Sequence, residues 1–197
     1  MKRASSLFLN HHLVSTGAAD LALVILSAFS GILMARLLGP TGRGQFAVAI
    51  LWPSVIAALG TLGVREALTY ERARAFYPAP ALVGTALVLA TVQSILLMGL
   101  ALFLIPWLTR TQSLDVTRAG QIFVLFIPTN LVTHYALGLL QGSLEIPVFN
   151  ALRLVVSVVH LGAVLVLWAL GWVTVWNVTL GLLIANACAA STGFGGD

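Results

Sequence analysis

Residues 35–46 of the chain read ARLLGPTGRGQF and lie between two long apolar runs. The Gly39-Pro40 pair predicts the end of a helix, because proline cannot donate to the helix ladder and disfavours helical geometry in the residue before it. Gly42 and Gly44 allow backbone angles that other residues avoid. Two arginines add fixed positive charge: Arg36 and Arg43. The segment therefore predicts a tight, basic corner where a membrane chain reverses direction.

The composition of the 197-residue chain predicts a membrane protein. Hydrophobic residues make up 59% of it and charged residues only 8%, whereas a soluble domain carries about 25% charged residues. The apolar residues come in blocks of roughly 20, long enough to cross a hydrocarbon core about 30 Å thick as helices. The net charge of +4 is spread along the chain without a basic cluster, which favours membrane lipids over nucleic acid as the partner.

Six apolar runs predict an all-α, polytopic membrane bundle of about six transmembrane helices, because a helix satisfies its own backbone in lipid. The predicted spans are about residues 13–35, 46–69, 80–106, 119–140, 148–170 and 173–192. Residues 1–12 are predicted as a short N-terminal segment, and residues 193–197 as a tail. Pro53 and Pro128 predict kinks in spans two and four. Four tryptophans fall near span ends, as belt residues do: Trp107, Trp168, Trp172 and Trp176.

The distribution of basic residues predicts a cytoplasmic N-terminus. This orientation places six basic residues inside: Lys2, Arg3, Arg65, Arg72, Arg74 and Arg153. It places four outside: Arg36, Arg43, Arg110 and Arg118. The segment 65–74 mixes both signs of charge and is predicted as a solvated cytoplasmic turn. The single cysteine, Cys188, excludes an internal disulfide.

Polar residues inside the apolar runs gather on single helical faces in three of the predicted spans. Span one carries Thr16, Asp20, Ser27 and Gly31; span four carries Asn130, His134 and Gln141; span five carries Asn150, Arg153, Ser157 and His160. Because lipid offers no hydrogen-bond partner, we expect these faces to point into the bundle or into a wet cavity. The alternatives are interhelical hydrogen bonds, a structural arginine or hydroxyl partner for Asp20, and an Arg153 that extends to the interface.

Patterns typical of catalysis are not found in the sequence. It has no paired loop carboxylates, no His, Cys and Asp residues at metal-binding spacing, and no phosphate-binding loop. We therefore expect a protein that is not an enzyme and that uses no metal and no cofactor.

The corner also resembles the first-loop signature of polysaccharide-biosynthesis flippases. These are the O-antigen and lipid-linked oligosaccharide exporters of the multidrug/oligosaccharidyl-lipid/polysaccharide superfamily. The similarity continues through residues 51–54 (LWPS) and 59–67 (LGTLGVREA). It extends to residues 140–142 (LQG) and 149–153 (FNALR), so that it covers most of residues 13–170.

This resemblance implies a transporter of two helical lobes with a polar cavity between them, of which the chain is the N-terminal lobe. Its partners are then a lipid-linked glycan, membrane lipids and a missing C-terminal lobe, and the small residues at its end indicate a truncated product. The location implied is the bacterial plasma (inner) membrane, with several passes. The candidate cavity residues are Asp20, Arg36, Arg43, Asn130, His134, Asn150, Arg153 and His160.

Three other functions fit the same sequence. A membrane scaffold or assembly subunit would use the polar faces only to join helices. A cation-coupled drug antiporter of the same superfamily would use them for transport of another cargo. A membrane-embedded transferase would need a carboxylate or histidine cluster at the interface, which is not seen. Since the polar faces lie within the spans, we expect the corner to shape the outer gate and not the substrate site.

Overall fold

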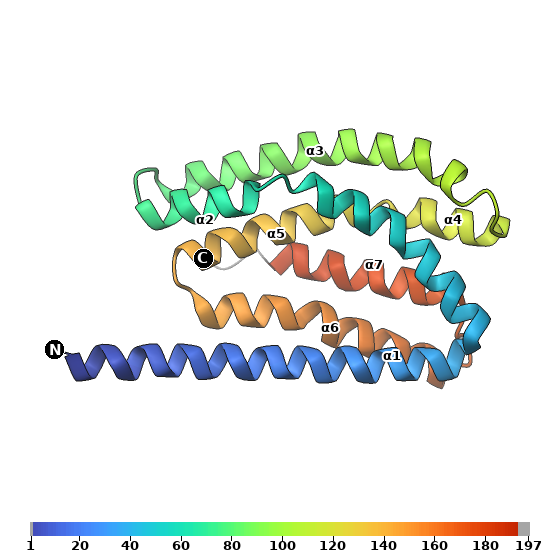
Figure 1. The fold of residues 1–197 in the computed structure, drawn as a ribbon, viewed down its shortest axis with the longest axis horizontal. Helices are drawn as coiled ribbons and strands as arrows, with labels where there is room; N and C mark the ends of the chain where they lie inside the picture. Colours follow the sequence, from blue (N-terminus) through green and yellow to red (C-terminus); the bar gives the residue numbers. More distant parts are fainter. Residues whose placement is uncertain (1, 193–197) are drawn as a thin grey trace.

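The computed structural model describes the backbone of residues 2–192 and the side chains of residues 16–192. Seven α-helices follow one another, with no strand in the described backbone (Figure 1): α1 (Lys2–Gly60), α2 (Val64–Arg74), α3 (Ala79–Leu108), α4 (Leu114–Phe123), α5 (Phe126–Gly142), α6 (Ile146–Ala169) and α7 (Val175–Thr192). The predicted all-α bundle is thus confirmed. The predicted tail, 193–197, lies outside the described residues, as do the side chains of the segment 1–12.

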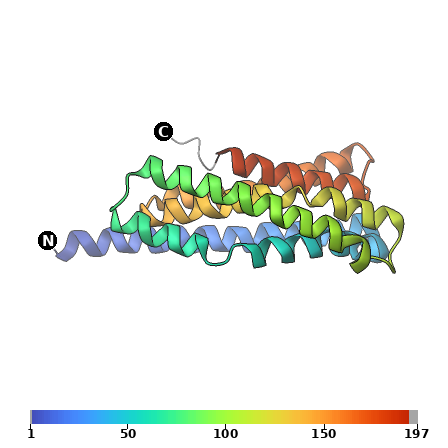
Figure 2. The same cartoon turned by 90° about the horizontal axis from the view of Figure 1, so that it is seen from above.

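The length and apolar character of the helices indicate a multi-pass membrane protein. Five segments are long and apolar enough to cross a bilayer: Thr16–Gly60, Ala79–Leu108, Leu114–Gly142, Ile146–Ala169 and Val175–Thr192. The first of them is bent into two arms at Gly39. With these arms taken separately, each predicted span has a helical counterpart. The long helices run side by side along one axis, as both ribbon views show (Figures 1 and 2).

A single residue makes the corner in α1. Gly39 has φ 68° and ψ 177°, a conformation that is essentially restricted to glycine. Pro40 starts the second arm, where its missing amide hydrogen costs nothing. Gly42 is needed for close packing, since a Cβ there would lie 3.1 Å from the Cβ of Leu38. Gly42 and Gly44 do not use the backbone angles that glycine allows, because neither has positive φ.

The second predicted span, 46–69, is two helices. The second arm of α1 already begins at Pro40 and ends at Gly60, and α2 starts at Val64. Between them Leu62 and Gly63 have positive φ, 44° and 75°, which ends the first helix without ending the apolar run. The charged segment 65–74 is therefore the helix α2 and not the predicted turn.

The two prolines predicted to kink their helices differ. Val124 and Leu125 separate α4 from α5, and the amide of Ile127 donates to the carbonyl of Val124 over 2.9 Å. Pro128 cannot make the next bond to that carbonyl, so the predicted break in span four is present. Within α1 only Gly39 departs from helical angles. Pro53 therefore does not interrupt the second arm.

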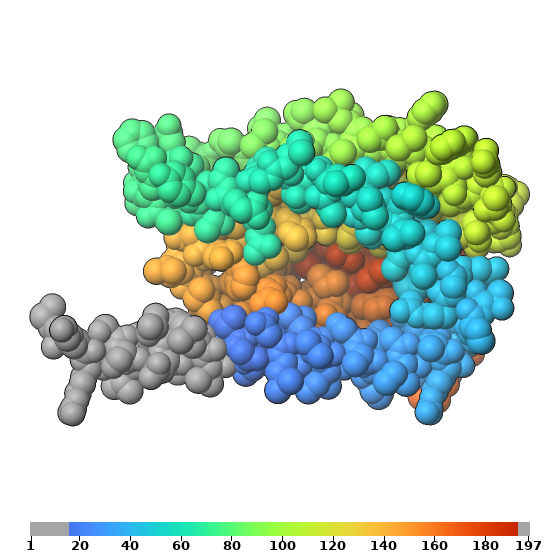
Figure 3. All heavy atoms as spheres, viewed as in Figure 1, coloured from blue at the N-terminus to red at the C-terminus, as the bar shows by residue number. Residues whose placement is uncertain are grey.

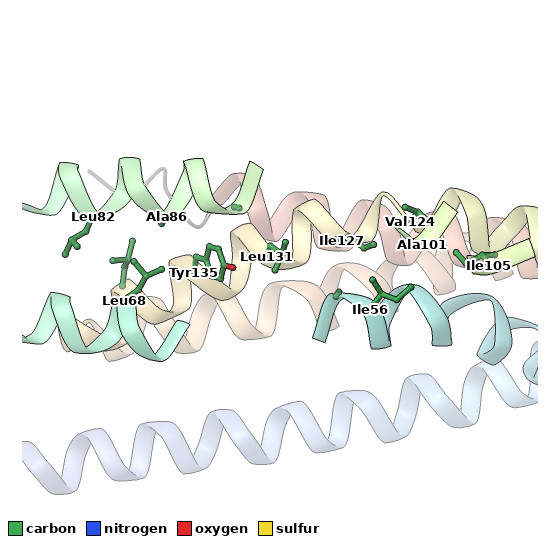
Figure 4. Packing of buried hydrophobic residues seen from close by; sticks show 13 residues of the cluster. Ile56, Leu68, Leu82, Ala86, Ala101, Ile105, Val124, Ile127, Leu131 and Tyr135 are labelled. Atoms are coloured by element: carbon green, nitrogen blue, oxygen red, sulfur yellow. The ribbon is translucent and has the colours of Figure 1, made fainter. Parts of the chain in front are cut away.

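Helix α5 is the centre of the largest hydrophobic core cluster. Figure 4 shows its residues Ile127, Leu131 and Tyr135 between α3 on one side and α2 with the second arm of α1 on the other. The hydroxyl of Tyr135 donates to the amide oxygen of Gln93 on α3. Since lipid tails are as apolar as these side chains, the helices associate here by van der Waals packing and by such hydrogen bonds.

The contact between α2 and α5 is unusually close. A Cβ at Gly138 would lie 2.8 Å from the carbonyl oxygen of Arg65, and a Cβ at Gly142 would lie 2.6 Å from that of Thr69. Thr69 donates its hydroxyl hydrogen to the carbonyl of Gly138 over 3.0 Å, and Arg65 donates to the side-chain oxygen of Gln141 over 3.3 Å. Two glycines four residues apart thus let two helix backbones touch.

Candidate functional site

A cleft of about 280 Å³ lies between the two arms of α1 and is completed by α6 and α7. We call it the arm cleft. Figure 3 shows the surface hollowed between the two arms, with parts of later helices visible inside. The lining residues are Leu26, Ser27, Ser30, Gly31, Met34, Arg43, Phe46, Ile50, Val156, Ser157, His160 and Leu182. The lining is mixed: five of the twelve residues carry a polar or charged side chain, namely Ser27, Ser30, Arg43, Ser157 and His160.

The polar side of the cleft follows from helical spacing. Ser27, Ser30 and Gly31 lie on one face of the first arm, and Ser157 and His160 lie on one face of α6. The structure turns these two faces toward the same cleft. The predicted polar faces of spans one and five therefore do meet. The bend at Gly39 adds Arg43 to them from the second arm.

Asp20 and Arg153 form an ion pair that joins α1 to α6. The guanidinium of Arg153 lies 2.7 Å from a carboxylate oxygen of Asp20, and the two side chains are 30% and 53% exposed. The guanidinium also lies over the ring of Phe149, 5.4 Å from its centre. Ser157, one helical turn after Arg153, lines the arm cleft. The ion pair thus lies on the polar face of α6, one helical turn beyond the cleft.

Arg43 supplies positive charge to the cleft. Its guanidinium lies 5.6 Å from the ring centre of Phe46, and among the side chains of residues 16–192 it has no ion-pair partner. His160 lines the same cleft, and its Nδ1 is buried without a hydrogen-bond partner in the described part of the chain. Arg43 of the corner, a predicted cavity residue, therefore lines the arm cleft.

Four other predicted residues do not line the arm cleft. Arg36 is exposed, whereas Asn150 is buried at 7% exposure with its side-chain oxygen unpaired in the described chain. Asn130 and His134 are half-buried on α5. The imidazole of His134 lies near the charges of Arg65 and Glu66 on α2.

The three polar faces do not all meet at one cavity: those of α1 and α6 line the arm cleft, whereas that of α5 packs within the bundle. The polar face of α5 lies toward α2, as the bond between Gln141 and Arg65 also shows. Helical phase gives the face of a helix but not the neighbour that the face meets. Ser30 and Met34 also line the cleft, and their side chains lie 3.9 Å apart. They were not predicted, although their spacing places them on the same helical face as Ser27.

The cleft is suited to an anion attached to an apolar body. The half-buried guanidinium of Arg43, which has no ion-pair partner among the described side chains, can attract a phosphate and donate two parallel hydrogen bonds to it. The apolar wall accommodates hydrocarbon. Serine hydroxyls and the imidazole nitrogen of His160 provide further hydrogen-bonding groups.

Comparisons with protein-family models, with curated proteins and with solved structures found no match to the chain. Its function is therefore argued from the arm cleft.

Proposed function

We propose that the chain is one lobe of a membrane flippase that moves lipid-linked oligosaccharide or polysaccharide precursors across a bilayer. The observation that carries the proposal is the arm cleft, in which Arg43, with no ion-pair partner among the described side chains, and His160 line one groove of mixed apolar and polar residues. In this proposal the phosphate groups of the lipid bind at Arg43. No covalent chemistry is needed, because differential binding and a change of shape suffice for transport.

The position of the cleft supports a lipid as the cargo. The cleft opens between two arms of a helix at the surface of the bundle (Figure 3). A lipid in the bilayer can therefore enter sideways, with its charged head in the cleft and its tail in the hydrocarbon. Outward-facing residues of the first arm are apolar and exposed, such as Val24 and Phe29, which keeps the tail in an apolar environment.

The bend at Gly39 supports a change of shape. The two arms are joined by one residue with non-helical angles, and changes of backbone angle at a few such residues are how hinges operate. Rotation at Gly39 changes the width of the arm cleft and moves Arg43 relative to α6. Alternating access in this proposal uses that motion together with a second helical lobe. The membrane is the bacterial plasma membrane, and the N-terminus is cytoplasmic.

Binding of a labelled lipid tests the proposal. The chain in lipid nanodiscs is titrated with a fluorescent polyprenyl-diphosphate disaccharide, and its movement between leaflets is followed in vesicles with a membrane-impermeant quencher. Loss of one charge-assisted contact predicts at least about tenfold weaker binding for Arg43→Ala. The matched control is Arg110→Ala, since Arg110 also lies over an aromatic ring, that of Trp107, but is outside the cleft. Equal binding by the two variants, or no binding by the folded chain, would overturn the proposal.

A scaffold that only joins helices is the second candidate, and the ion pair of Asp20 with Arg153 favours it. That pair bridges α1 and α6 and needs no ligand. A scaffold predicts that Asp20→Asn lowers the stability of the bundle while lipid binding stays independent of Arg43. The flippase proposal predicts that binding depends on Arg43 even in variants of normal stability.

A further inference from the structure

A second and larger pocket, of about 530 Å³, lies at the end of the bundle that contains the Gly39 corner. We call it the end pocket. It is formed where the start of the second arm, helix α4 and the connection from α6 to α7 come together, at the right in Figure 1. Its polar and aromatic lining residues are Gln45, Asp115, Arg118, Thr174 and Trp176. Its volume is in the range typical of small-molecule sites, about 300–1,000 Å³.

The lining offers both hydrogen-bond donors and acceptors. The carboxylate of Asp115 accepts, the guanidinium of Arg118 donates, and the amide of Gln45 does both. Asp115 and Arg118 are three residues apart on α4, yet they form no ion pair within the described chain. Both charges are therefore free to bind a ligand. Because they have opposite signs, they favour a ligand with many hydroxyl groups over a simple anion.

One wall of the pocket is aromatic and apolar. Trp176 is 39% exposed, so that part of its ring system is free. Val116 and Ala119 line the pocket from α4 and are themselves almost fully buried. A sugar ring has hydroxyl groups around its edge and C–H bonds on its faces. An aromatic face beside hydrogen-bonding side chains matches both parts of such a ring.

Local hydrogen bonds fix the helix starts that carry both walls of the pocket. On α4, the amide of Val116 donates to the side chain of Ser113 over 3.4 Å, which caps the helix turn that carries Asp115. At the start of α7, the amide of Asn177 donates to the hydroxyl of Thr174 over 3.1 Å, and its side chain donates to the carbonyl of Trp172 over 2.8 Å. Preorganised walls lower the entropic cost of binding.

From this lining we infer that the end pocket binds a neutral saccharide. The inference rests on the proposed function and names the place of the glycan: Arg43 lines the arm cleft and Gln45, two residues later on the same helix, lines the end pocket. Residues two apart on a helix point to nearly opposite sides, so a lipid-linked glycan with its phosphate at Arg43 would reach Trp176 by passing around the second arm. The two sites share the first turns of the second arm, so motion at Gly39 moves both.

Binding of soluble sugars tests the inference without the lipid. The chain in nanodiscs is screened by saturation-transfer-difference NMR against tetrasaccharides of glucose, galactose, mannose, rhamnose and N-acetylglucosamine. We expect at least one of them to bind and Trp176→Ala to weaken it at least about fivefold, by loss of the stacked ring. Trp107→Ala is the matched control, because Trp107 is an exposed tryptophan outside the pocket. Arg118→Ala and Arg110→Ala form a second such pair.

The results separate this inference from the proposed function. If no tetrasaccharide binds the folded chain, or if Trp176→Ala and Trp107→Ala have equal effects, the end pocket is not a saccharide site, whatever the lipid assay shows. If saccharide binding depends on Trp176 but lipid binding does not depend on Arg43, the saccharide site stands and the flippase proposal fails.

Discussion

The contact between α2 and α5 differs in kind from the contact between α1 and α6. In the first, Gly138 and Gly142 bring two backbones together so closely that no side chain fits between them. In the second, the ion pair of Asp20 with Arg153 joins the helices on one side of a cleft, and an apolar cluster with Met34 and Val164 joins them near the corner. The first contact is close between backbones, whereas the second leaves a cleft between its two points of attachment.

This difference divides the bundle into a tightly packed part and an open part. Close packing has few alternatives, because even small shifts lose many van der Waals contacts. At the Asp20 end, where one partly exposed ion pair bridges α1 and α6, several separations of the helices are possible at modest cost. We therefore interpret α2, α3 and α5 as the frame of the protein and the first arm of α1 as the part that moves.

The largest expected effect is on the frame, from Gly138→Leu. The new Cβ would lie 2.8 Å from a backbone oxygen of α2, so the helices must separate and the bond from Thr69 to Gly138 is lost. We expect a destabilisation of about 3 kcal/mol or more, measured as a lower thermal midpoint in detergent. Gly162→Leu is the control, since nothing lies within 4 Å of a Cβ there. Similar midpoints for the two variants would show that the contact is not close.

A smaller effect is expected at the hinge, from Gly39→Ala. The backbone angles of Gly39 are strained for any other residue, at a cost of about 1–3 kcal/mol, and relief of that strain changes the angle between the arms. We expect the distribution of distances between spin labels at Phe29 and Leu51, one on each arm, to shift or to broaden. Gly44→Ala serves as the control, because Gly44 lies in the helix without positive φ and nothing lies within 4 Å of a Cβ there. An unchanged distance distribution in Gly39→Ala would argue against a hinge.

The smallest effect is expected from the ion pair itself. Both partners are partly exposed, so we expect a coupling energy of about 1 kcal/mol or less in a double-mutant cycle of Asp20→Asn and Arg153→Gln. The cycle is measured by thermal unfolding of the four proteins. A coupling of several kcal/mol would contradict the view of α1 and α6 as loosely joined.

The fold could be predicted from the sequence because its signals are local. Blocks of apolar residues indicate an all-α membrane bundle, and Gly39-Pro40 indicates the reversal. Helix α2 could not be predicted from hydropathy, because the apolar run continues across Gly60 and Leu62, where the helix ends. The backbone conformation of Leu62, with φ 44°, depends on packing that the sequence does not reveal.

The candidate site could be predicted only in part, for the same reason. Helical phase correctly placed Ser157 and His160 on the face of α6 that meets the cleft. The face that carries His134 meets α2 and not the cleft, because helical phase does not say which neighbour a face meets. The end pocket combines Gln45, Asp115 and Trp176 from three distant segments, so that only the tertiary structure brings them together.

The central claim, that the arm cleft is a polar site open to water and to a charged ligand, is tested most directly by cysteine accessibility. In a Cys188→Ala chain in nanodiscs, Ser157→Cys places a thiol in the cleft, and Val158→Cys places one at the same depth on the exposed outer face of α6. We expect a water-soluble maleimide to label Ser157→Cys at least about tenfold faster than Val158→Cys, because thiolate forms only where water reaches. We also expect the polyprenyl-diphosphate disaccharide to slow the labelling of Ser157→Cys. Equally slow labelling at both positions would contradict the account.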